Sequence, residues 1–332
     1  MAEFAPGIAD KSVYGDVASE LHPGDITDFV LQRHDTVRRP GRPHYDLRLG
    51  TKDTNLFSWA IPKAELPGPG ESRLAPQTHR HSYQYGNFQG RIPHGYGAGN
   101  VSMADKGKAI INKVTPNTVQ FTLGHKKVPV RYTLVNTNPA KRQWLLVGAP
   151  RPGKIPGVGT KPVITQIRAE DQDAAIDKAV EVQQKIDGAS GVVNIGKGGD
   201  IEVYSANTSV SGEPIRHTER MGLFGTKVPG RYAGQSLRGE LFFRDKKGRA
   251  IPFKDVSALL NALPANSIER QRASGYRPQI AVFDSINGED TARQELLDLL
   301  PKAVFTTPKS ARTPEEKSEL IRRIREGKDP DT

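Results

Sequence analysis

Cysteine is absent from the 332 residues of this chain. Its absence excludes disulfide bonds and thiolate metal sites, so any metal ion has to be bound by histidine, aspartate or glutamate. The sequence also lacks an apolar run near the roughly 20 residues that a membrane-spanning helix needs. Residues 1–7 contain no basic region followed by an apolar stretch, so a secretory signal is not expected. These absences favour a protein of a reducing compartment with no membrane partner.

Acidic residues are outnumbered by basic ones. The chain has 48 lysine and arginine residues against 37 aspartate and glutamate residues, which gives a formal net charge of +11. A basic balance of this size favours a polyanionic partner, of which nucleic acid is the commonest. Charge alone does not distinguish DNA from RNA, and lysines that serve only solubility are the alternative interpretation.

Helical periodicity is scarce in the first half of the chain. From residue 28 to residue 146, short apolar segments alternate with glycine and proline. Six of them are expected to be strands: residues 29–31, 56–61, 109–111, 118–121, 130–134 and 144–147. Many short strands at close spacing predict a small closed or nearly closed β-barrel over residues 25–147. Residues 1–24 are polar and aperiodic, and are predicted to be a loose N-terminal arm.

The second half has a different character. Residues 148–162 carry four prolines, four glycines and no acidic residue, which predicts a stiff basic linker. Residues 163–332 are expected to be an α+β domain. Hairpins are predicted over residues 192–204 and 241–248. Helices are predicted over residues 172–180, 256–263, 291–300 and 314–326. The last helix has Thr313 as N-cap, Glu316 completing a capping box and Gly327 as its end.

Chemistry is concentrated in the segment from His44 to Leu49. Its polar and apolar residues alternate as in a half-buried strand. One face of such a strand carries His44, Asp46 and Arg48 at steps of about 7 Å. A neutral imidazole and a carboxylate suit a divalent transition metal, while a planar guanidinium suits phosphate oxygens. This row of side chains predicts a metal-assisted phosphoryl site.

Other histidines lie nearby in the sequence, with six of the eight between residues 22 and 94. A single histidine is more often a surface or structural residue than a ligand. Together with two members of the row, however, His34 completes a set of two imidazoles and one carboxylate with open positions for water and substrate. An ion held there polarises a phosphoryl oxygen. Arg48, His81 and Tyr85 are expected to hold the remaining oxygens and to stabilise charge in the transition state.

These residues resemble, in type and order, the 3′-phosphoesterase domain of bacterial DNA ligase D. The resemblance covers about residues 26 to 150 and is carried by residues 29–35, 44–48, 59–63, 81–99 and 144–146. It implies a small β-barrel that binds Mn²⁺ or a similar ion. It also implies removal of a 3′-terminal ribonucleotide or 3′-phosphate from a primer strand, which leaves a 3′-hydroxyl. By this resemblance the metal ligands are His34, His44 and Asp46, and the phosphate-binding and catalytic groups are Arg48, His81 and Tyr85.

The sequence departs from the family pattern at two places. The basic segment Arg38–Pro43 lengthens the loop between His34 and His44, which makes His34 the least secure of the expected ligands. An alternative role for this loop is contact with the nucleic-acid backbone. The second departure is His94, which precedes Gly95-Tyr96 where the family has an acidic residue before the tyrosine.

A second group of motifs lies in the C-terminal half. Lys185-Ile186-Asp187-Gly188 is weak evidence by itself, because a charged residue before a turn is common. Together with residues 237–241 and 282–284 it resembles three nucleotidyltransferase motifs of ATP-dependent DNA ligases, over about residues 160 to 332. A lysine with its ordinary pKa of about 10.4 is a poor nucleophile at neutral pH, and a pocket that lowers this pKa lets the amine attack the α-phosphate of ATP.

This second resemblance implies a role for each matching residue. Lys185 would carry AMP, Asp187 would orient the lysine turn, Glu240 would contact the ribose or a metal ion, and Phe283 would stack on adenine. Ser190 and Ala206 stand where many ligases have arginine, and Arg216 or Arg220 are alternatives. The family's later elements do not follow before Thr332, so sealing by this chain alone is not expected.

The sequence therefore predicts a mixed architecture, with a small phosphoesterase-like β-barrel followed by a partial adenylation domain of the ATP-dependent ligase type. The expected function is processing of DNA ends in repair, with Mn²⁺ and ATP as cofactors. DNA ends and end-joining repair proteins are the expected partners, and the cytoplasm, in association with the nucleoid, is the expected location. Two alternatives stay open: a non-catalytic module that binds DNA or RNA ends beside a degenerate ligase-like domain, and RNA-end repair by the same chemistry.

Overall fold

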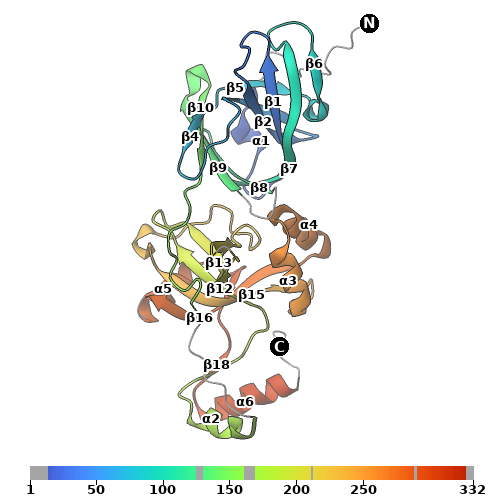
Figure 1. Cartoon of the computed structure of the whole chain (residues 1–332). Helices are drawn as coiled ribbons and strands as arrows, with labels where there is room; N and C mark the ends of the chain where they lie inside the picture. The colour runs from blue at the N-terminus through green and yellow to red at the C-terminus, as the bar shows by residue number, and fades with distance from the viewer. Residues whose placement is uncertain (1–13, 125–129, 161–168, 211, 288–289, 327–332) are drawn as a thin grey trace. The chain divides into compact units, whose positions relative to one another are not determined.

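The computed structural model describes residues 14–124, 130–160, 169–210, 212–287 and 290–326 (Figure 1). The chain divides into two compact units. Unit 1 comprises residues 1–151 with 263–265, and unit 2 comprises residues 152–262 with 266–332. None of the helices in the described ranges is long and apolar enough to cross a membrane.

Unit 1 is built around one antiparallel sheet. Its strand order is β4-β10-β9-β8-β7-β1-β2-β3-β5, and β6 pairs with β7 outside this path. The strands are β1 (Ile26–Thr36), β2 (His44–Thr51), β3 (Asn55–Pro62), β4 (Ser72–Leu74), β5 (Gln77–His81), β6 (Gly90–Ile92), β7 (Gly99–Thr115), β8 (Thr118–Gly124), β9 (Val130–Asn138) and β10 (Gln143–Gly148). The short helical turns are α1 (Val17–Glu20), η1 (Tyr83–Asn87) and η2 (Pro139–Lys141). Each of the six predicted strand segments lies within one of these strands.

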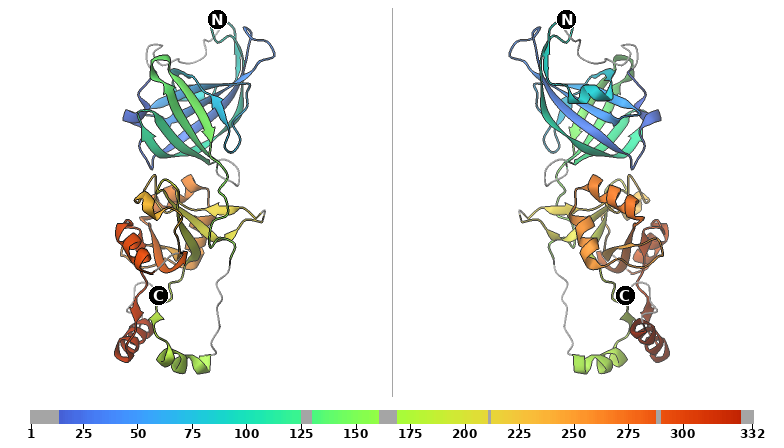
Figure 2. Two further views of the ribbon diagram at one scale, coloured as in Figure 1. Left: turned by 90° about the vertical axis from the view of Figure 1, so that its left-hand side faces the viewer. Right: turned by 90° about the vertical axis from the view of Figure 1, so that its right-hand side faces the viewer.

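The sheet curls strongly, but strand pairing does not close it into a barrel, so of the predicted closed or nearly closed barrel the closed form is excluded (Figure 2). The end strands β4 and β5 pair with β10 and β3 respectively, and not with each other. Residues 75 and 76, which connect β4 to β5, form hydrogen bonds with strands at both ends of the sheet. The Ala75 amide donates to the Trp144 carbonyl of β10 at 2.8 Å, and the Ala60 amide of β3 donates to the Pro76 carbonyl at 3.0 Å. Pro76 has no N–H group to donate, so a regular ladder cannot run through this connection.

The core of unit 1 lies on the concave side of the sheet. The rings of Trp59 and Trp144 meet edge to face with centroids 6.1 Å apart, and both side chains are buried. The structure differs from the predicted loose arm in the described part of residues 1–24. Val17 and Leu21 are buried in this core, because the α1 turn presents its apolar residues to the sheet.

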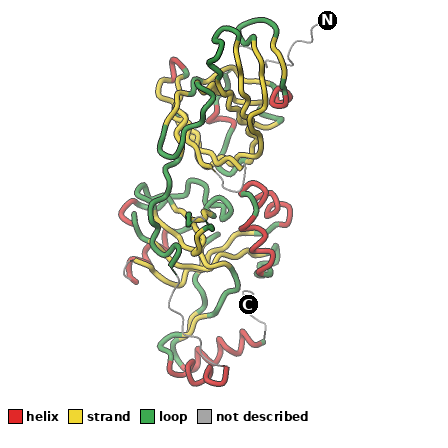
Figure 3. Tube along the Cα trace, viewed as in Figure 1, coloured by secondary structure: helices red, strands yellow, loops and turns green. Residues whose placement is uncertain are grey.

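Unit 2 contains the longer helices and the two smaller sheets (Figure 3). A six-stranded sheet has the order β14-β13-β12-β15-β16-β17, and β11 pairs with β18. The strands are β11 (Val182–Gln183), β12 (Ala189–Ile195), β13 (Ile201–Thr208), β14 (Pro214–Arg216), β15 (Ser236–Arg244), β16 (Arg277–Asn287), β17 (Phe305–Thr306) and β18 (Ser310–Ala311). The helices are η3 (Ala169–Asp171), α2 (Gln172–Lys178), η4 (Gly230–Tyr232), α3 (Phe253–Asn261), α4 (Pro264–Ser274), α5 (Asp290–Leu299) and α6 (Pro314–Arg325).

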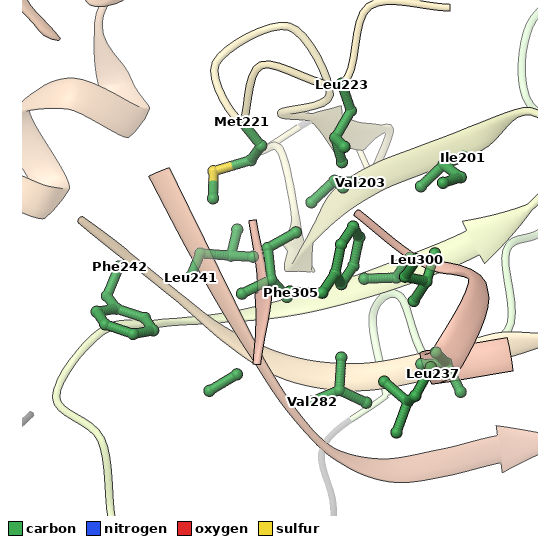
Figure 4. Packing of buried hydrophobic residues seen from close by; sticks show 14 of the residues in the cluster. Ile201, Val203, Met221, Leu223, Leu237, Leu241, Phe242, Val282, Leu300 and Phe305 are labelled. Atoms are coloured by element: carbon green, nitrogen blue, oxygen red, sulfur yellow. The ribbon is translucent and has the colours of Figure 1, made fainter. Parts of the chain in front are cut away.

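Apolar residues from this sheet and its helices form the core of unit 2. Leu237, Val282 and Phe305 are buried among them (Figure 4). The predicted hairpin around residues 196–200 is confirmed, because β12 and β13 pair antiparallel up to Ile195 and Ile201. Sequence analysis missed α4, whose apolar residues are too few to mark a helical face.

Helix α6 begins as predicted. The Thr313 side chain accepts from the Glu316 amide, the Glu316 carboxylate accepts from the Thr313 amide, and Pro314 occupies the first turn. Gly327, the predicted end of this helix, lies outside the described residues. Part of the predicted linker is packed rather than extended: Ile155 and Val158 are buried against the unit 2 sheet.

Candidate metal and phosphate site

The β1–β2 hairpin brings the predicted ligands together. Its register pairs His34 with His44 and Gln32 with Asp46. Residues 37–43 form the tip of this hairpin, beyond the paired residues. A longer tip leaves the antiparallel register unchanged, so the lengthened loop does not displace His34 from its partner across the ladder.

Strand alternation then places the polar row on one face of β2. Leu47 and Leu49 point into the core and are 1% and 0% exposed. His44, Asp46 and Arg48 therefore share the opposite face. The predicted strand is confirmed, but it is not half-buried as expected, because Asp46 and Arg48 on the polar face are only 7% and 2% exposed.

Three ligand atoms from His34, His44 and Asp46 lie within 4.8 Å of one another. His34 Nδ1 is 3.7 Å from Asp46 Oδ2, and His44 Nε2 is 3.6 Å from Asp46 Oδ1. Two imidazoles and one carboxylate at this spacing form a donor set that suits a divalent transition metal and leaves coordination positions free. We refer to these three residues as the ligand triad.

The tautomer of His34 fits a metal ligand. Its Nε2 lies 2.9 Å from the Gly97 carbonyl oxygen, which can only accept a hydrogen bond. Nε2 therefore serves as the donor to Gly97, and Nδ1 is the ring nitrogen that faces Asp46 and that a metal ion would bind. Metal-binding histidines commonly donate their other N–H to a backbone carbonyl in this way, because that bond holds the ring orientation.

Asp46 is held in its charged form. Burial disfavours the carboxylate, but the Arg48 guanidinium and the imidazoles of His34 and His44 outweigh burial and keep the pKa of Asp46 well below its usual range. Arg48 Nη2 lies 3.3 Å from Asp46 Oδ2. A buried anionic oxygen is thus available to a cation at neutral pH.

Arg48 is positioned by a residue that sequence analysis missed. It is 2% exposed and donates from Nη1 to Gln32 Oε1. The Gln32 amide in turn donates to the carbonyls of Tyr85, at 3.2 Å, and Phe88, at 2.7 Å. Gln32 precedes His34 by two residues, so its place on the same strand face was the available signal. Among the described groups, the buried Nε of Arg48 has no hydrogen-bond partner.

His81 and Tyr85 lie beside Arg48. The Arg48 Cζ is 5.1 Å from the centroid of the Tyr85 ring, and the rings of Tyr85 and His81 have centroids 4.8 Å apart. Burial, aided by the charge of Arg48, lowers the pKa of His81 to about 4, so its ring is neutral at neutral pH. Burial also raises the pKa of Tyr85, so its hydroxyl stays protonated. Phe88, also missed from the sequence, stacks on Tyr85 with centroids 5.2 Å apart.

The structure thus joins all six residues predicted for this site through a continuous series of contacts. The arrangement combines an anionic metal-binding set, a guanidinium with an unpaired donor, and two neutral groups that can bind phosphate oxygens. Such a site can hold a cation against a phosphoryl group and stabilise the charge that develops on it.

The residues predicted for the second site lie in unit 2. Lys185 and Asp187 are exposed in the segment between β11 and β12, and Glu240 is half-buried on β15. Burial raises the pKa of Glu240 to about 7, although the charge of Lys185 and the Gly188 amide oppose this shift. Lys185 and Glu240 are therefore close enough to interact. Phe283 lies on the neighbouring strand β16, two residues beyond the partner of Glu240.

Comparison with known proteins identifies the first of these regions. Residues 32–136 match the family described as the DNA Ligase D 3′-phosphoesterase domain. The chain is 36% identical over 129 residues to the multifunctional non-homologous end joining protein LigD of Pseudomonas aeruginosa, a region that is 36% of this chain and 15% of that protein. The protein of the same name from Mycobacterium bovis is 39% identical over 120 residues, covering 35% of this chain and 15% of the relative.

The match is confined to a part of each protein. The chain spans about 15% of the length of these curated relatives. The family match ends at residue 136, so the adenylation domain predicted for residues 163–332 stays a prediction. The N-terminal region of this chain contains a LigD-type 3′-phosphoesterase domain, homologous to the corresponding part of the multifunctional LigD proteins.

Proposed function

We propose that unit 1 is a metal-dependent 3′-phosphoesterase that processes DNA ends in break repair. Its reaction removes a 3′-terminal ribonucleotide or 3′-phosphate and leaves a 3′-hydroxyl that can be extended or sealed. The observation that carries this proposal is the ligand triad, which lies beside the buried Arg48 within the region that matches the phosphoesterase family.

Each side chain of the site has a role in this proposal. His34, His44 and Asp46 would hold Mn²⁺ or a similar ion, which polarises a phosphoryl oxygen and lowers the pKa of bound water. Arg48 would bind a non-bridging oxygen through its guanidinium group. Neutral His81 and protonated Tyr85 bind further oxygens without adding a second positive charge.

The test uses a labelled primer–template with either a 3′-phosphate or a 3′-terminal ribonucleotide, incubated with the full chain and Mn²⁺. The wild-type chain should convert both ends to a 3′-hydroxyl, and His44→Ala should not. His22→Ala is the matched control, because His22 is an exposed histidine of the same unit with its side chain 69% accessible. Equal activity in wild type and His44→Ala would refute the metal site.

The proposed setting of this activity is end processing in non-homologous end joining. The proposed partners are DNA ends and other end-joining proteins, and the proposed location is the cytoplasm, in association with the nucleoid. Tight binding of DNA ends without turnover by the wild-type chain would instead support the non-catalytic end-binding alternative. Turnover only on RNA strands would support RNA-end repair.

A second function is proposed for unit 2, where Lys185 would be adenylated by ATP. The carrying observation is the β12–β15 register, which pairs Ser190 with Glu240 and so places Glu240 beside the strand that follows Lys185 and the Gly188 turn. The neutral Lys185 amine would attack the α-phosphorus of ATP. A P–N bond forms, the bond from the α-phosphorus to the bridging oxygen breaks, and pyrophosphate leaves with that electron pair while the amine loses a proton. Asp187 would orient the lysine turn, Glu240 would contact the ribose or a metal ion, and Phe283 would stack on adenine.

Incubation with ATP labelled at the α-phosphate tests this second proposal. Wild type should form an acid-stable AMP adduct that Lys185→Ala abolishes. Lys197→Ala is the matched control, because Lys197 is an exposed lysine in the β12–β13 turn. Absence of an adduct in the wild-type chain would leave unit 2 without ATP chemistry, and an adduct that persists in Lys185→Ala would place it on another residue.

A further inference from the structure

An exposed aromatic ring stands at the edge of the phosphoesterase site. Tyr96 is 85% exposed, whereas aromatic side chains such as Trp59 and Phe57 are fully buried in the same unit. The Arg38 guanidinium carbon lies 5.0 Å from the centroid of the Tyr96 ring. This is a cation–π contact, which restrains the ring while most of its surface stays accessible.

Hydrogen bonds attach the backbone that follows this ring to the ligand triad and to the hairpin tip. The residue that follows it, Gly97, accepts the bond from His34 Nε2 at 2.9 Å. The Val37 amide at the start of the hairpin tip donates to the Ala98 carbonyl at 2.9 Å. Because adjacent Cα atoms are about 3.8 Å apart, the backbone of Tyr96 lies within roughly one nucleotide's length of the metal site.

The surroundings of the ring are basic. The hairpin tip, residues 37–43, contains Arg38, Arg39 and Arg42 and no acidic residue. All three arginines are exposed, and within the described structure none of them forms an ion pair with a carboxylate. Exposed aromatic rings combined with uncompensated positive charge are the features with which proteins bind unpaired nucleotides, through base stacking and phosphate contacts.

We propose that Tyr96, supported by Arg38, stacks on the base of the terminal nucleotide whose 3′-phosphate enters the site. The inference rests on the proposed phosphoesterase function and adds a base-binding position to it. The terminal nucleotide is the one within reach, because its base and its 3′-phosphate are attached to the same sugar. A site with this position binds a frayed or unpaired 3′ end and discriminates against an end that lacks its base.

The experiment measures binding and processing of two ends by the full-length chain. Both are primer–templates with a 3′-phosphate; one has an ordinary terminal nucleotide and the other an abasic tetrahydrofuran residue at that position. Dissociation constants are measured by fluorescence anisotropy in EDTA, and processing rates are measured separately with Mn²⁺. The variants are Tyr96→Ala and, as the matched control that retains the ring, Tyr96→Phe.

Wild type and Tyr96→Phe should bind the ordinary end about tenfold more tightly than the abasic end, a difference typical of one base–aromatic stack. Tyr96→Ala should bind both ends with the affinity that wild type has for the abasic end. Equal discrimination by wild type and Tyr96→Ala would overturn the proposal. So would discrimination that depends on a base of the template strand instead of the primer terminus.

The two proposals fail in distinguishable ways. If wild type processes the 3′-phosphate but Tyr96→Ala retains full discrimination, only the stacking position is wrong. If discrimination follows Tyr96 but no end is processed with Mn²⁺, stacking stands and the phosphoesterase proposal fails. If the wild-type chain binds neither end above a blunt control duplex and processes neither with Mn²⁺, both are overturned.

Discussion

Two carboxyl groups in this chain have pKa values that move in opposite directions. Asp46 in unit 1 is buried, yet Arg48 and two imidazoles keep its pKa well below the usual range. Glu240 in unit 2 is also removed from water, but Lys185 and one backbone amide do not compensate, and burial raises its pKa to about 7. The number of cationic and donor groups around a buried acid, and not burial itself, decides whether it is charged.

The same contrast separates the two candidate sites. In unit 1 the functional side chains contact one another and are held by buried hydrogen bonds, as expected of a preorganised site. In unit 2 Lys185 and Asp187 are exposed on a connecting segment, and only Glu240 is partly enclosed. The side chains of the first candidate site are therefore already in contact without a ligand, whereas the second candidate site would have to be completed by one.

The largest expected effect comes from removing the charge at the centre of the first site. Asp46→Asn should lower kcat/KM for 3′-phosphate release by at least about a hundredfold, because it removes an anionic metal ligand and the partner of Arg48. The rate is measured with saturating Mn²⁺. Asp53→Asn is the control, since Asp53 is an exposed aspartate in the turn between β2 and β3. A loss below about threefold would show that the charged carboxylate is not needed.

Gln32→Leu tests whether the hydrogen bonds behind Arg48 create the preorganisation. The change frees the guanidinium and leaves the carbonyls of Tyr85 and Phe88 without their donor. We expect kcat/KM to fall about 10- to 100-fold. The free energy of unfolding should also fall, by about 1–3 kcal/mol. Since Gln32 acts through Arg48, the loss should disappear in an Arg48→Ala background; additive losses would refute this positioning role.

Glu240→Gln tests the carboxyl group of unit 2, whose pKa is raised where that of Asp46 is lowered. The pKa of Glu240 is raised in the folded state, so protonation stabilises the fold below the unfolded value of about 4.5, and this stabilisation is lost as pH rises through about 7. The amide cannot ionise. The variant should therefore gain stability relative to wild type between pH 5 and pH 8, by about 2 kcal/mol after allowance for partial exposure. Parallel urea-unfolding profiles against pH would contradict the raised pKa.

The smallest expected effect on the first site comes from the hairpin tip. Replacing Arg38, Arg39 and Arg42 with serine should leave Mn²⁺ affinity within about twofold, because the register of His34 and His44 lies behind the tip. DNA affinity should weaken. The slope of log K against log salt should become shallower, by the amount that corresponds to the loss of up to about three phosphate contacts. An unchanged slope would show that the tip does not contact phosphates.

Local patterns predicted much of the fold. The alternation around Asp46 identified a strand with a polar face, and Thr313 and Glu316 identified the start of α6, because both signals arise between residues within a few positions of each other. The sequence did not indicate that Ala75 and Pro76 would form hydrogen bonds with β10 and β3 without closing the sheet into a barrel. It also did not show that residues 14–24 and 149–160 would pack onto the sheets, because those contacts depend on distant strands.

For the site, the sequence by itself determined which residues share the face of β2, since strand alternation is a property of neighbouring residues. It determined as well the chemical types available to a metal and a phosphate, in a chain without cysteine. Only the tertiary structure decided that His34 lies across from His44 despite the lengthened loop, and that Gln32 joins Arg48 to Tyr85, 53 residues away from it. Register and long-range hydrogen bonds depend on how strands assemble, and that assembly is decided by packing of the whole core.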